Sequence, residues 1–315
     1  MALYTSLRRR DVDEIARIYG LDLTGFEHMP GGASNTSYIL KTQSAKFVLT
    51  VFDNKPLALV RKMARILRLL SQNQIPSTSV ISSQSGEEIV VFKNQPIMLK
   101  TYARGGAFRD LNAERLRQAG AALAELHAIP APDFLDQNHY YNLETIPFVL
   151  ENVSHEEFQM WLRGAIKNYE KKTGGTLPKG FIHGDLFYDN ILFDDNRLSA
   201  IIDFEDACNY YKIFDIGMAG VGLCSSEDGF SIEKLGAMVG GYQKKRELEV
   251  VEKAALKACV AYAAAATASW RFWKYRIDAP SPEKRDAYLK MVALADAVQA
   301  IPETHFQEQV FNQRN

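Results

Sequence analysis

Three polar residues between positions 180 and 206 have side chains and a spacing that could do chemistry. Asp185 stands in the stretch FIHGDLFYDNILF, and Asn190 follows it five residues later. After a turn, the apolar strand LSAIID ends in a second aspartate, Asp203. A carboxylate can take the proton of a reacting hydroxyl, and carboxylate and amide oxygens are ligands for Mg²⁺. The pattern therefore predicts a general base, Asp185, beside a metal held by Asn190 and Asp203.

The same spacing occurs in the catalytic loop of protein kinases, H-R-D-L-x-x-x-N, and the DFE that begins at Asp203 stands where kinases have D-F-G. Such a site takes ATP and Mg²⁺, because the metal neutralises charge on the phosphates. The alternative is that these residues only cap loops; both motifs in one strand context favour the chemical interpretation. For two nearby residues we expect structural roles. His183 should support the loop backbone, and Asp215 should cap a helix and hold the loop in place.

The elements before residue 103 are mostly strands. Alternation of apolar and polar residues predicts strands, and apolar residues at helical spacing predict helices. In chain order we expect a helix at 11–19, a strand at 24–29, a glycine-rich turn followed by a strand, the returning strand KFVLTVFD at 46–53, a helix at 57–72, and strands at 88–92 and 96–102.

Two segments of this sheet are predicted to bind the nucleotide. Backbone N–H groups of a glycine-rich turn can approach a phosphate because no bulky side chain interferes. Backbone groups at the end of the last strand, where kinases have their hinge, can bind adenine. The residues are Gly31, Gly32, Ser34 and Asn35 in the turn, and Lys100, Tyr102 and Ala103 in the hinge.

Beyond residue 103 the pattern becomes mainly helical, with one compact β segment at 180–206. We expect helices at 112–128, 154–172, 231–245, 250–277 and 283–300. The fold class is therefore α+β, a bilobal protein-kinase-like fold with a small β-rich N-lobe and a larger, mainly helical C-lobe. Residues 1–102 are expected to form the nucleotide-binding lobe and residues 103–315 the catalytic and acceptor-binding lobe, with the site in the cleft between them.

Composition narrows the class of partner. The formal net charge is -1, so there is no electrostatic reason to expect nucleic acid or an anionic membrane as a partner. Three widely spaced cysteines indicate free thiols in a reducing compartment. The N-terminus lacks the apolar core of a secretory signal, and the most apolar helix, 258–270, is too short to span a bilayer. We expect a cytoplasmic protein and leave its oligomeric state open.

Several of these segments resemble one superfamily of small-molecule kinases. GGASNTSY, IHGDLFYDNILF, AIIDFEDAC and FDIGMA are similar to motifs of the aminoglycoside phosphotransferase and choline kinase-like group. Only a short gap separates Asp203 from Asp215, with no room for the long activation segment of protein kinases, so a small-molecule acceptor is favoured. Within the group, ALYTSLRRRDVDEIARIYGL, FVLTVFD, the 183–218 segment and SWRFWKYRI resemble the bacterial homoserine kinase family. That resemblance implies phosphorylation of the primary hydroxyl of L-homoserine, in threonine biosynthesis.

The strand KFVLTVFD departs from the usual kinase pattern. Thr50 stands where kinases carry a lysine that pairs with a glutamate of the following helix. That helix, LALVRKMARILRLLSQ, has no acid, so both partners are absent together and the nucleotide site is expected to be built in another way. Arg61 or Arg65 of the helix could reach the phosphates. Two further departures from the homoserine kinase pattern are Gly184, usually alanine, and Glu205, usually aromatic.

The acceptor remains open at this point. The carboxylate of an amino acid alcohol would need a guanidinium, from Arg271 or Arg276, and its ammonium group would need Glu205 or Asp206. A choline-like acceptor would need an aromatic cage, which NHYYN and the tryptophans could form, and an aminoglycoside would need a dense acidic pocket that the sequence lacks. Methylthioribose is a further alcohol of the group. The remaining alternative, a non-catalytic binding protein with a kinase-like fold, depends mainly on Thr50.

Overall fold

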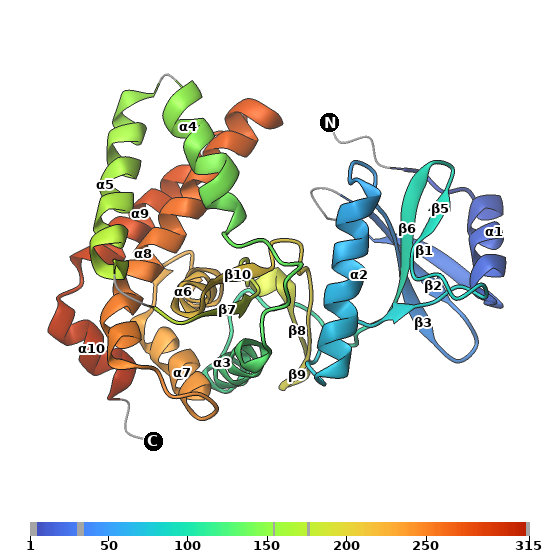
Figure 1. The fold of residues 1–315 in the computed structure, drawn as a ribbon, viewed down its shortest axis with the longest axis horizontal. Coiled ribbons are helices and arrows are strands. Elements are labelled where there is room, and N and C mark those ends of the chain that lie inside the picture. The colour runs from blue at the N-terminus through green and yellow to red at the C-terminus, as the bar shows by residue number, and fades with distance from the viewer. Residues whose placement is uncertain (1–4, 30–34, 154, 175–176, 313–315) are drawn as a thin grey trace. The chain divides into compact units, whose positions relative to one another are not determined.

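The chain divides into two compact units. The computed structural model describes residues 5–29, 35–153, 155–174 and 177–312. Unit 1 contains Met1–Arg104 and Ser199–Ile202, and unit 2 contains Gly105–Leu198 and Asp203–Asn315. The predicted fold class is confirmed: a small antiparallel sheet dominates unit 1, and helices dominate unit 2 (Figure 1).

Unit 1 is built on a six-stranded antiparallel sheet in the order β1-β2-β3-β6-β4, with β5 paired to β6. Its strands are β1 (Gly25–Met29), β2 (Thr36–Lys41), β3 (Lys46–Val51), β4 (Val80–Ile81), β5 (Val90–Phe92) and β6 (Gln95–Thr101). Alternation sends Leu49 and Val51 of β3 into the core, while Thr50 faces the other side of the sheet.

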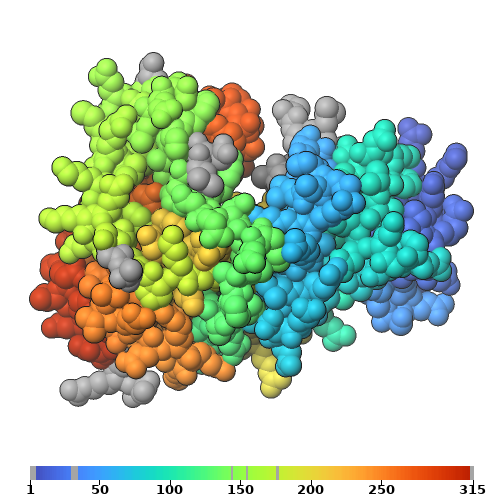
Figure 2. All heavy atoms as spheres, viewed as in Figure 1, coloured from blue at the N-terminus to red at the C-terminus, as the bar shows by residue number. Residues whose placement is uncertain are grey.

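Two helices flank the strands of unit 1 (Figure 1). Helix α1 (Arg9–Tyr19) buries Val12, Ile15 and Tyr19 against the apolar face of the sheet. Helix α2 (Leu57–Gln72) buries Val60, Ala64 and three other apolar side chains, while its arginines are exposed. The atoms of α2 form part of the surface seen in Figure 2.

Unit 2 is mainly helical. Its helices are α3 (Ala113–Ala128), η1 (Tyr141–Thr145), α4 (Ile146–Asn152), α5 (Glu156–Thr173), α6 (Lys212–Leu223), α7 (Ile232–Gln243), α8 (Val250–Trp273), η3 (Lys274–Asp278), α9 (Ala287–Ala300) and α10 (Glu303–Phe311). In Figure 1, α5 and α9 lie along α8. Nearly every residue of α6 is buried, and the alanine-rich α8 packs on it closely enough that a Cβ on Gly217 would meet the Cys259 backbone at 2.7 Å.

Short strands carry the polar segment at 180–206. Strand β7 (Lys179–Ile182) pairs with β10 (Cys208–Tyr211), and β8 (Ile191–Asp194) pairs with β9 (Arg197–Ile201). A single 3₁₀ turn, η2 (Tyr188–Asn190), lies between β7 and β8, and β11 (Ser225–Ser226) and β12 (Gly229–Phe230) form a small hairpin.

Most predicted helices of unit 2 are confirmed, and the differences are informative. The predicted helix at 250–277 is α-helical only to Trp273 and then continues as the π-helical turn η3. Helices η1, α4 and α10 were not predicted from the sequence. Among the described residues, no helix is both long enough and apolar enough to cross a bilayer.

Candidate functional site

The pairing of β7 with β10 brings the acidic residues of the 180–206 segment together. Cys208 lies opposite Ile182, so the chain that leaves β7 and the chain that enters β10 meet at the same end of this strand pair. Asp185 follows β7 by three residues, and Asp206 precedes β10 by two. Both strands consist largely of buried residues, so the position of the two acids is set by the core of unit 2.

Asp185 lies in a strongly anionic environment. Burial raises the pKa of its carboxyl well above the usual value, and the charges of Asp206, Asp203 and Asp189 raise it further. A hydrogen bond from the Tyr141 hydroxyl to Oδ1, at 3.3 Å, acts in the opposite direction and lowers the pKa. A base placed among other carboxylates is suited to proton transfer, because neighbouring negative charge increases its affinity for a proton.

The residues predicted to hold the metal, Asn190 and Asp203, lie close to Asp185. The Asn190 amide nitrogen donates to the Asp185 carbonyl at 2.8 Å, which leaves the amide oxygen as the ligand atom of that side chain. Asp203 is exposed, and its φ of 65° is unusual for a residue with a side chain. Aspartate tolerates this conformation better than most residues, and such positions occur in turns and also cluster at active sites.

The oxygen atoms of Asn190 and Asp203, beside Asp185, suit a divalent cation. A cation would offset the repulsion among the carboxylates around Asp185, and one carboxylate with one amide oxygen is a typical protein share of a magnesium site completed by phosphates. The described residues contain no group of three or more His, Cys, Asp or Glu side chains able to hold a metal by themselves. Asn190 and Asp203 therefore fit a metal that arrives with its nucleotide.

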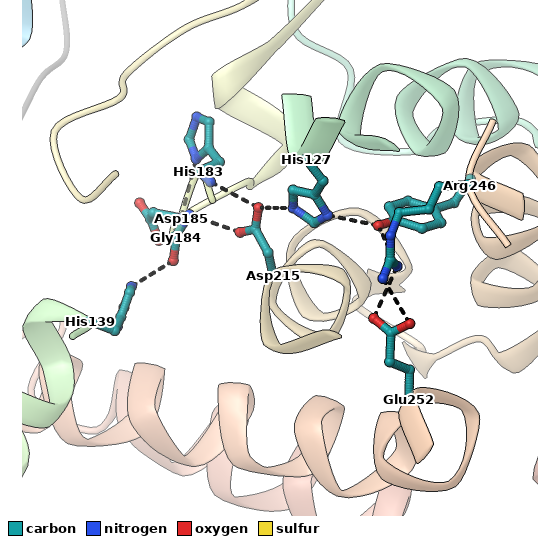
Figure 3. A network of polar contacts seen from close by, with 9 residues as sticks. His127, His139, His183, Gly184, Asp185, Asp215, Arg246 and Glu252 are labelled. Atoms are coloured by element: carbon teal, nitrogen blue, oxygen red, sulfur yellow. Dashed lines mark hydrogen bonds and ion pairs between the residues drawn. The ribbon is translucent and has the colours of Figure 1, made fainter. Parts of the chain in front are cut away.

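Asp215 holds the backbone that precedes the base. Its carboxylate accepts the backbone N–H groups of His183 and Gly184, both at 2.8 Å, and lies in the first turn of α6 without capping that helix (Figure 3). Burial raises its pKa, but hydrogen bonds from His127 and the loop outweigh burial and hold the pKa below its usual value. The His183 ring accepts the backbone N–H of Asp185 through Nδ1 at 3.2 Å. Both side chains thus contact loop backbone.

A chain of buried hydrogen bonds leads from Asp215 to the far end of α7 (Figure 3). Burial lowers the pKa of His127, so its ring is neutral; Nε2 donates to Asp215 at 3.0 Å, and Nδ1 accepts from the Tyr242 hydroxyl at 2.8 Å. Arg246 donates to that hydroxyl and makes two bonds of 3.0 Å to Glu252. Every group has a partner of the correct kind, which is what a buried polar network requires.

Gly184 is a position where only glycine fits without strain. Its φ is 86°, and an added Cβ would lie 2.7 Å from the carbonyl oxygen of Asp206 and 3.0 Å from Nε2 of His139. In this chain an alanine at position 184 would need the Asp206 carbonyl or the His139 ring to shift.

On the acceptor side, the structure separates the two candidate arginines. Arg271, at the end of α8, is half-buried and interacts electrostatically with Tyr141 and Asp185; burial lowers the pKa of its guanidinium, which remains a cation. Arg276 instead packs over the rings of Phe272 and Tyr288 and pairs with Asp286 at 2.6 Å. Those contacts pack Arg276 against two rings, and its role in substrate binding stays a prediction.

The two acidic candidates also differ. Asp206 is half-buried and interacts electrostatically with Asp185 and Tyr141. Glu205 is half-buried as well, and its predicted role in binding the ammonium group stays a prediction.

The predicted nucleotide residues belong to unit 1. Gly31, Gly32 and Ser34 lie outside the described residues, and Asn35, directly before β2, is half-buried. Lys100 lies on β6 opposite Val48, and Tyr102 and Ala103 follow that strand; all three are half-buried. The ammonium group of Lys46 lies over the Tyr102 ring, 5.3 Å from its centre.

Thr50, which replaces the usual lysine, belongs to a hydroxyl pair. It is buried, and its Oγ1 lies 3.4 Å from Oγ of Ser37 on β2. Ser37 is the residue directly opposite it in the sheet. A cross-strand hydroxyl pair therefore occupies this position, and α2 carries no acid that would need a lysine.

Sequence reasoning missed three residues of this site. His127 was not identified because a histidine on an apolar helix looks like any core residue. His139 and Tyr141 occur in NHYYN, which had been considered only as part of an aromatic cage; instead His139 donates to the Gly184 carbonyl at 2.9 Å and Tyr141 to Asp185. Histidines and tyrosines clustered in a polar loop were the available signal.

The sequence matches a known protein family and several of its members. A family model described as "Phosphotransferase enzyme family" matches residues 26–249. The chain is 28% identical to a homoserine kinase of Nitrobacter hamburgensis, covering 81% of each chain, and 30% identical to one of Neisseria meningitidis serogroup B, covering 81% of this chain and 85% of that one.

Solved structures with little sequence similarity show the same fold. An amicoumacin kinase in complex with AMP-PNP, Ca²⁺ and Ami superimposes with a TM-score of 0.73 at 14% identity, covering 95% of both chains. A microcompartment-associated aminopropanol kinase gives a TM-score of 0.68 at 19% identity, covering 94% of this chain and 98% of that chain.

Proposed function

The chain belongs to the phosphotransferase enzyme family and, within it, to the homoserine kinases, and on that premise we propose that it transfers the γ-phosphoryl group of ATP to the hydroxyl of L-homoserine. The observation that supports this most directly is Asp185 itself. It is a carboxylate with raised proton affinity, on a loop held by Asp215, beside Asn190 and Asp203. These are the parts that phosphoryl transfer to an alcohol needs.

In the proposed reaction, Asp185 accepts the proton of the acceptor hydroxyl as its oxygen attacks the γ-phosphorus in line, and ADP leaves. Asn190 and Asp203 would hold Mg²⁺, which supplies charge neutralisation on the phosphate oxygens. The backbone on the N-terminal side of the base is held by two hydrogen bonds to Asp215. We assign the nucleotide to residues of unit 1, namely Gly31, Gly32, Ser34, Asn35, Lys100, Tyr102 and Ala103.

An amino acid acceptor suits the charges around Asp185. Arg271 is a half-buried cation that interacts with Asp185 and Tyr141, and it would bind the carboxylate of homoserine. Asp206 carries the opposite charge on the same side and would bind the ammonium group. A choline-like acceptor has no carboxylate for Arg271, and the aromatic residues His139 and Tyr141 are buried and already bonded rather than forming an open cage.

The chain is a phosphotransferase with an alcohol acceptor, so the non-catalytic alternative falls away. Thr50 was its main support, and it has a structural explanation in the pair with Ser37. We also propose a reducing, cytoplasmic compartment, which the free thiols of Cys208, Cys224 and Cys259 support.

A coupled ADP-release assay with Mg²⁺ tests the function. L-homoserine, choline, methylthioribose and an aminoglycoside are compared as acceptors, and we expect the highest kcat/KM with homoserine. Asp185→Ala should lower kcat by at least about 10²–10⁴-fold, the usual contribution of a general base. Asp194→Ala, which removes an exposed carboxylate on β8, is the matched control. Turnover of another acceptor in preference to homoserine would refute the substrate, and full activity of Asp185→Ala would refute the mechanism.

A further inference from the structure

One segment that contacts the base has no role in the proposed function so far. It is the bracing segment, residues 138–142, which runs into the π-helical turn η1. Two of its side chains reach the catalytic loop, one at the backbone before Asp185 and one at the carboxylate itself. Turns of the π type are rare and occur frequently at functional sites.

His139 contacts the backbone side. It is fully buried, and burial lowers its pKa to about 4, so the ring is neutral at physiological pH. Its Nε2 lies 2.9 Å from the Gly184 carbonyl oxygen (Figure 3), and since a carbonyl only accepts, Nε2 carries the proton. The ring is held edge-on by Tyr141 at 4.7 Å and packs on Phe214 at 5.0 Å. This histidine is thus a rigid donor aimed at one peptide group.

Tyr141 contacts the carboxylate side. Its side chain is buried, and burial together with the charges of Asp185 and Asp206 raises the pKa of its hydroxyl well above the usual value. The phenol therefore keeps its proton and donates it to Oδ1 of Asp185. A hydrogen bond to one oxygen restricts the rotation of the carboxylate and leaves its second oxygen, Oδ2, for other partners.

The bracing segment is itself anchored from two other elements of unit 2. The Asn142 amide donates to the Tyr210 hydroxyl of β10 at 3.0 Å, and its oxygen accepts from the Tyr262 hydroxyl of α8 at 2.5 Å. Tyr169 of α5 bonds Tyr210 at 3.2 Å and stacks on Tyr262 with ring centres 4.0 Å apart. Hydrogen bonds from several rigid elements leave the segment little freedom to shift.

We propose that His139 and Tyr141 are positioning residues of the phosphotransferase reaction, which fix the backbone and the carboxylate rotation of Asp185 so that Oδ2 faces the acceptor hydroxyl. The inference rests on the proposed function only in taking Asp185 as the base. It adds a reason for the π turn η1, which carries Tyr141. A displacement of about 1 Å at a reacting group can cost about a hundredfold in rate, so such bracing matters to kcat.

Tyr141→Phe tests the carboxylate contact, because it keeps the buried ring and removes only the hydroxyl. We expect kcat to fall about 10–100-fold, the range for one hydrogen bond to a charged group, with KM for ATP and for the acceptor within about threefold of wild type. Tyr211→Phe is the matched control, since it removes the hydroxyl of a half-buried tyrosine on β10. A purely structural role would change the unfolding midpoint without this separation of kcat from KM.

The histidine is tested by a pair of variants. His139→Gln keeps an N–H donor that can reach the Gly184 carbonyl, and we expect it to retain kcat within about threefold. His139→Leu removes the donor, and we expect kcat to fall about tenfold or more. Equal kcat values for these two variants would overturn the role of the histidine.

Crystal structures of wild type and Tyr141→Phe decide the geometry whatever the acceptor proves to be. The expected result is a rotated or disordered Asp185 carboxylate in the variant, at an unchanged Cα position. A carboxylate that keeps its orientation overturns the proposal, as does a Tyr141→Phe enzyme with wild-type kcat. If wild type turns over none of the four acceptors, the proposed function fails, and the structural comparison still decides whether the two residues position Asp185.

Discussion

Replacing Gly184 with alanine adds a single methyl group to the residue that directly precedes Asp185. The residue has a φ of 86°, and its N–H and C=O are bonded to Asp215 and His139 respectively. The new Cβ would lie 2.7 Å from the Asp206 carbonyl oxygen and 3.0 Å from Nε2 of His139. Neither neighbour can move freely, because Asp206 leads directly into the β7–β10 pair and His139 is enclosed by rings.

The cost can be worked out from these contacts. A left-handed conformation costs a residue with a Cβ about 1–2 kcal/mol. If the loop shifts to relieve the close contact, the hydrogen bond from His139 weakens, which costs about 1 kcal/mol more. We therefore expect Gly184→Ala to lower the free energy of unfolding of unit 2 by about 2–3 kcal/mol, with a fall in kcat because Asp185 is the next residue.

Tryptophan fluorescence during urea unfolding measures this change selectively. The three tryptophans of the chain, Trp161, Trp270 and Trp273, all belong to unit 2, so their emission follows that unit. The control is Gly164→Ala, on the exposed side of α5 with no atom near the added methyl; it should be neutral or stabilising by up to about 1 kcal/mol. If Gly184→Ala unfolds at the wild-type urea concentration and keeps its kcat, the reasoning from φ and contact distance is wrong.

Two further predictions concern charge. Arg271→Lys keeps the cation but loses the planar fork that binds a carboxylate, so KM for homoserine should rise about tenfold in steady-state assays; the same rise in Arg276→Lys instead would place the carboxylate at the other arginine. The second concerns the loss of stability at low pH. Burial in the folded chain lowers the pKa of His139 from 6.5 to about 4. Between pH 7 and 5 the unfolded chain therefore binds a proton that the folded chain does not, and His139 alone lowers the free energy of unfolding by about 2 kcal/mol over that interval. In urea unfolding, the stability that His139→Gln loses between pH 7 and 5 should be about 2 kcal/mol smaller than the loss in wild type. Equal losses in wild type and the variant would refute the lowered pKa of His139.

Much of the fold could be predicted from local patterns. The helix expected at 57–72 and the strand at 46–53 have strong periodicity, and their ends agree with α2 and β3 to within two residues. Helix η1 could not be predicted, because its five residues are too few for a period and its stability comes from contacts with α8. The π turn after Trp273 was missed for a related reason: its composition is helical, and only tertiary contacts select the wider turn.

For the site, too, residues that are close in sequence could be predicted and residues that are far apart could not. Asp185, Asn190 and Asp203 could be identified from sequence because one short segment carries all three, so their spacing is a local property. His139 contacts a residue 45 positions away, Tyr141 one 44 positions away, and His127 one 88 positions away. A single sequence contains no record of such pairings, and the same side chains are equally suited to a core or an aromatic cage. Arg271 and Arg276 show the converse: they look equivalent in sequence, and only the packing of Arg276 on two rings separates them.

The loop around Asp185 is held by many hydrogen bonds because the base lies among other carboxylates. Asp185 has three other carboxylates among the charges acting on it, so repulsion favours any conformation that moves it away from them. Hydrogen bonds on several sides hold it in place. Asp215 accepts from the two preceding N–H groups, and His139 donates to the Gly184 carbonyl. Asn190 donates to the Asp185 carbonyl, and Tyr141 donates to the Asp185 carboxylate. Burial raises the proton affinity of Asp185 most, and the same repulsion raises it further, as a base for an alcohol requires. Repulsion therefore contributes both to the need for bracing and to the basicity, and a variant that relaxes the loop should lose rate even where its stability improves.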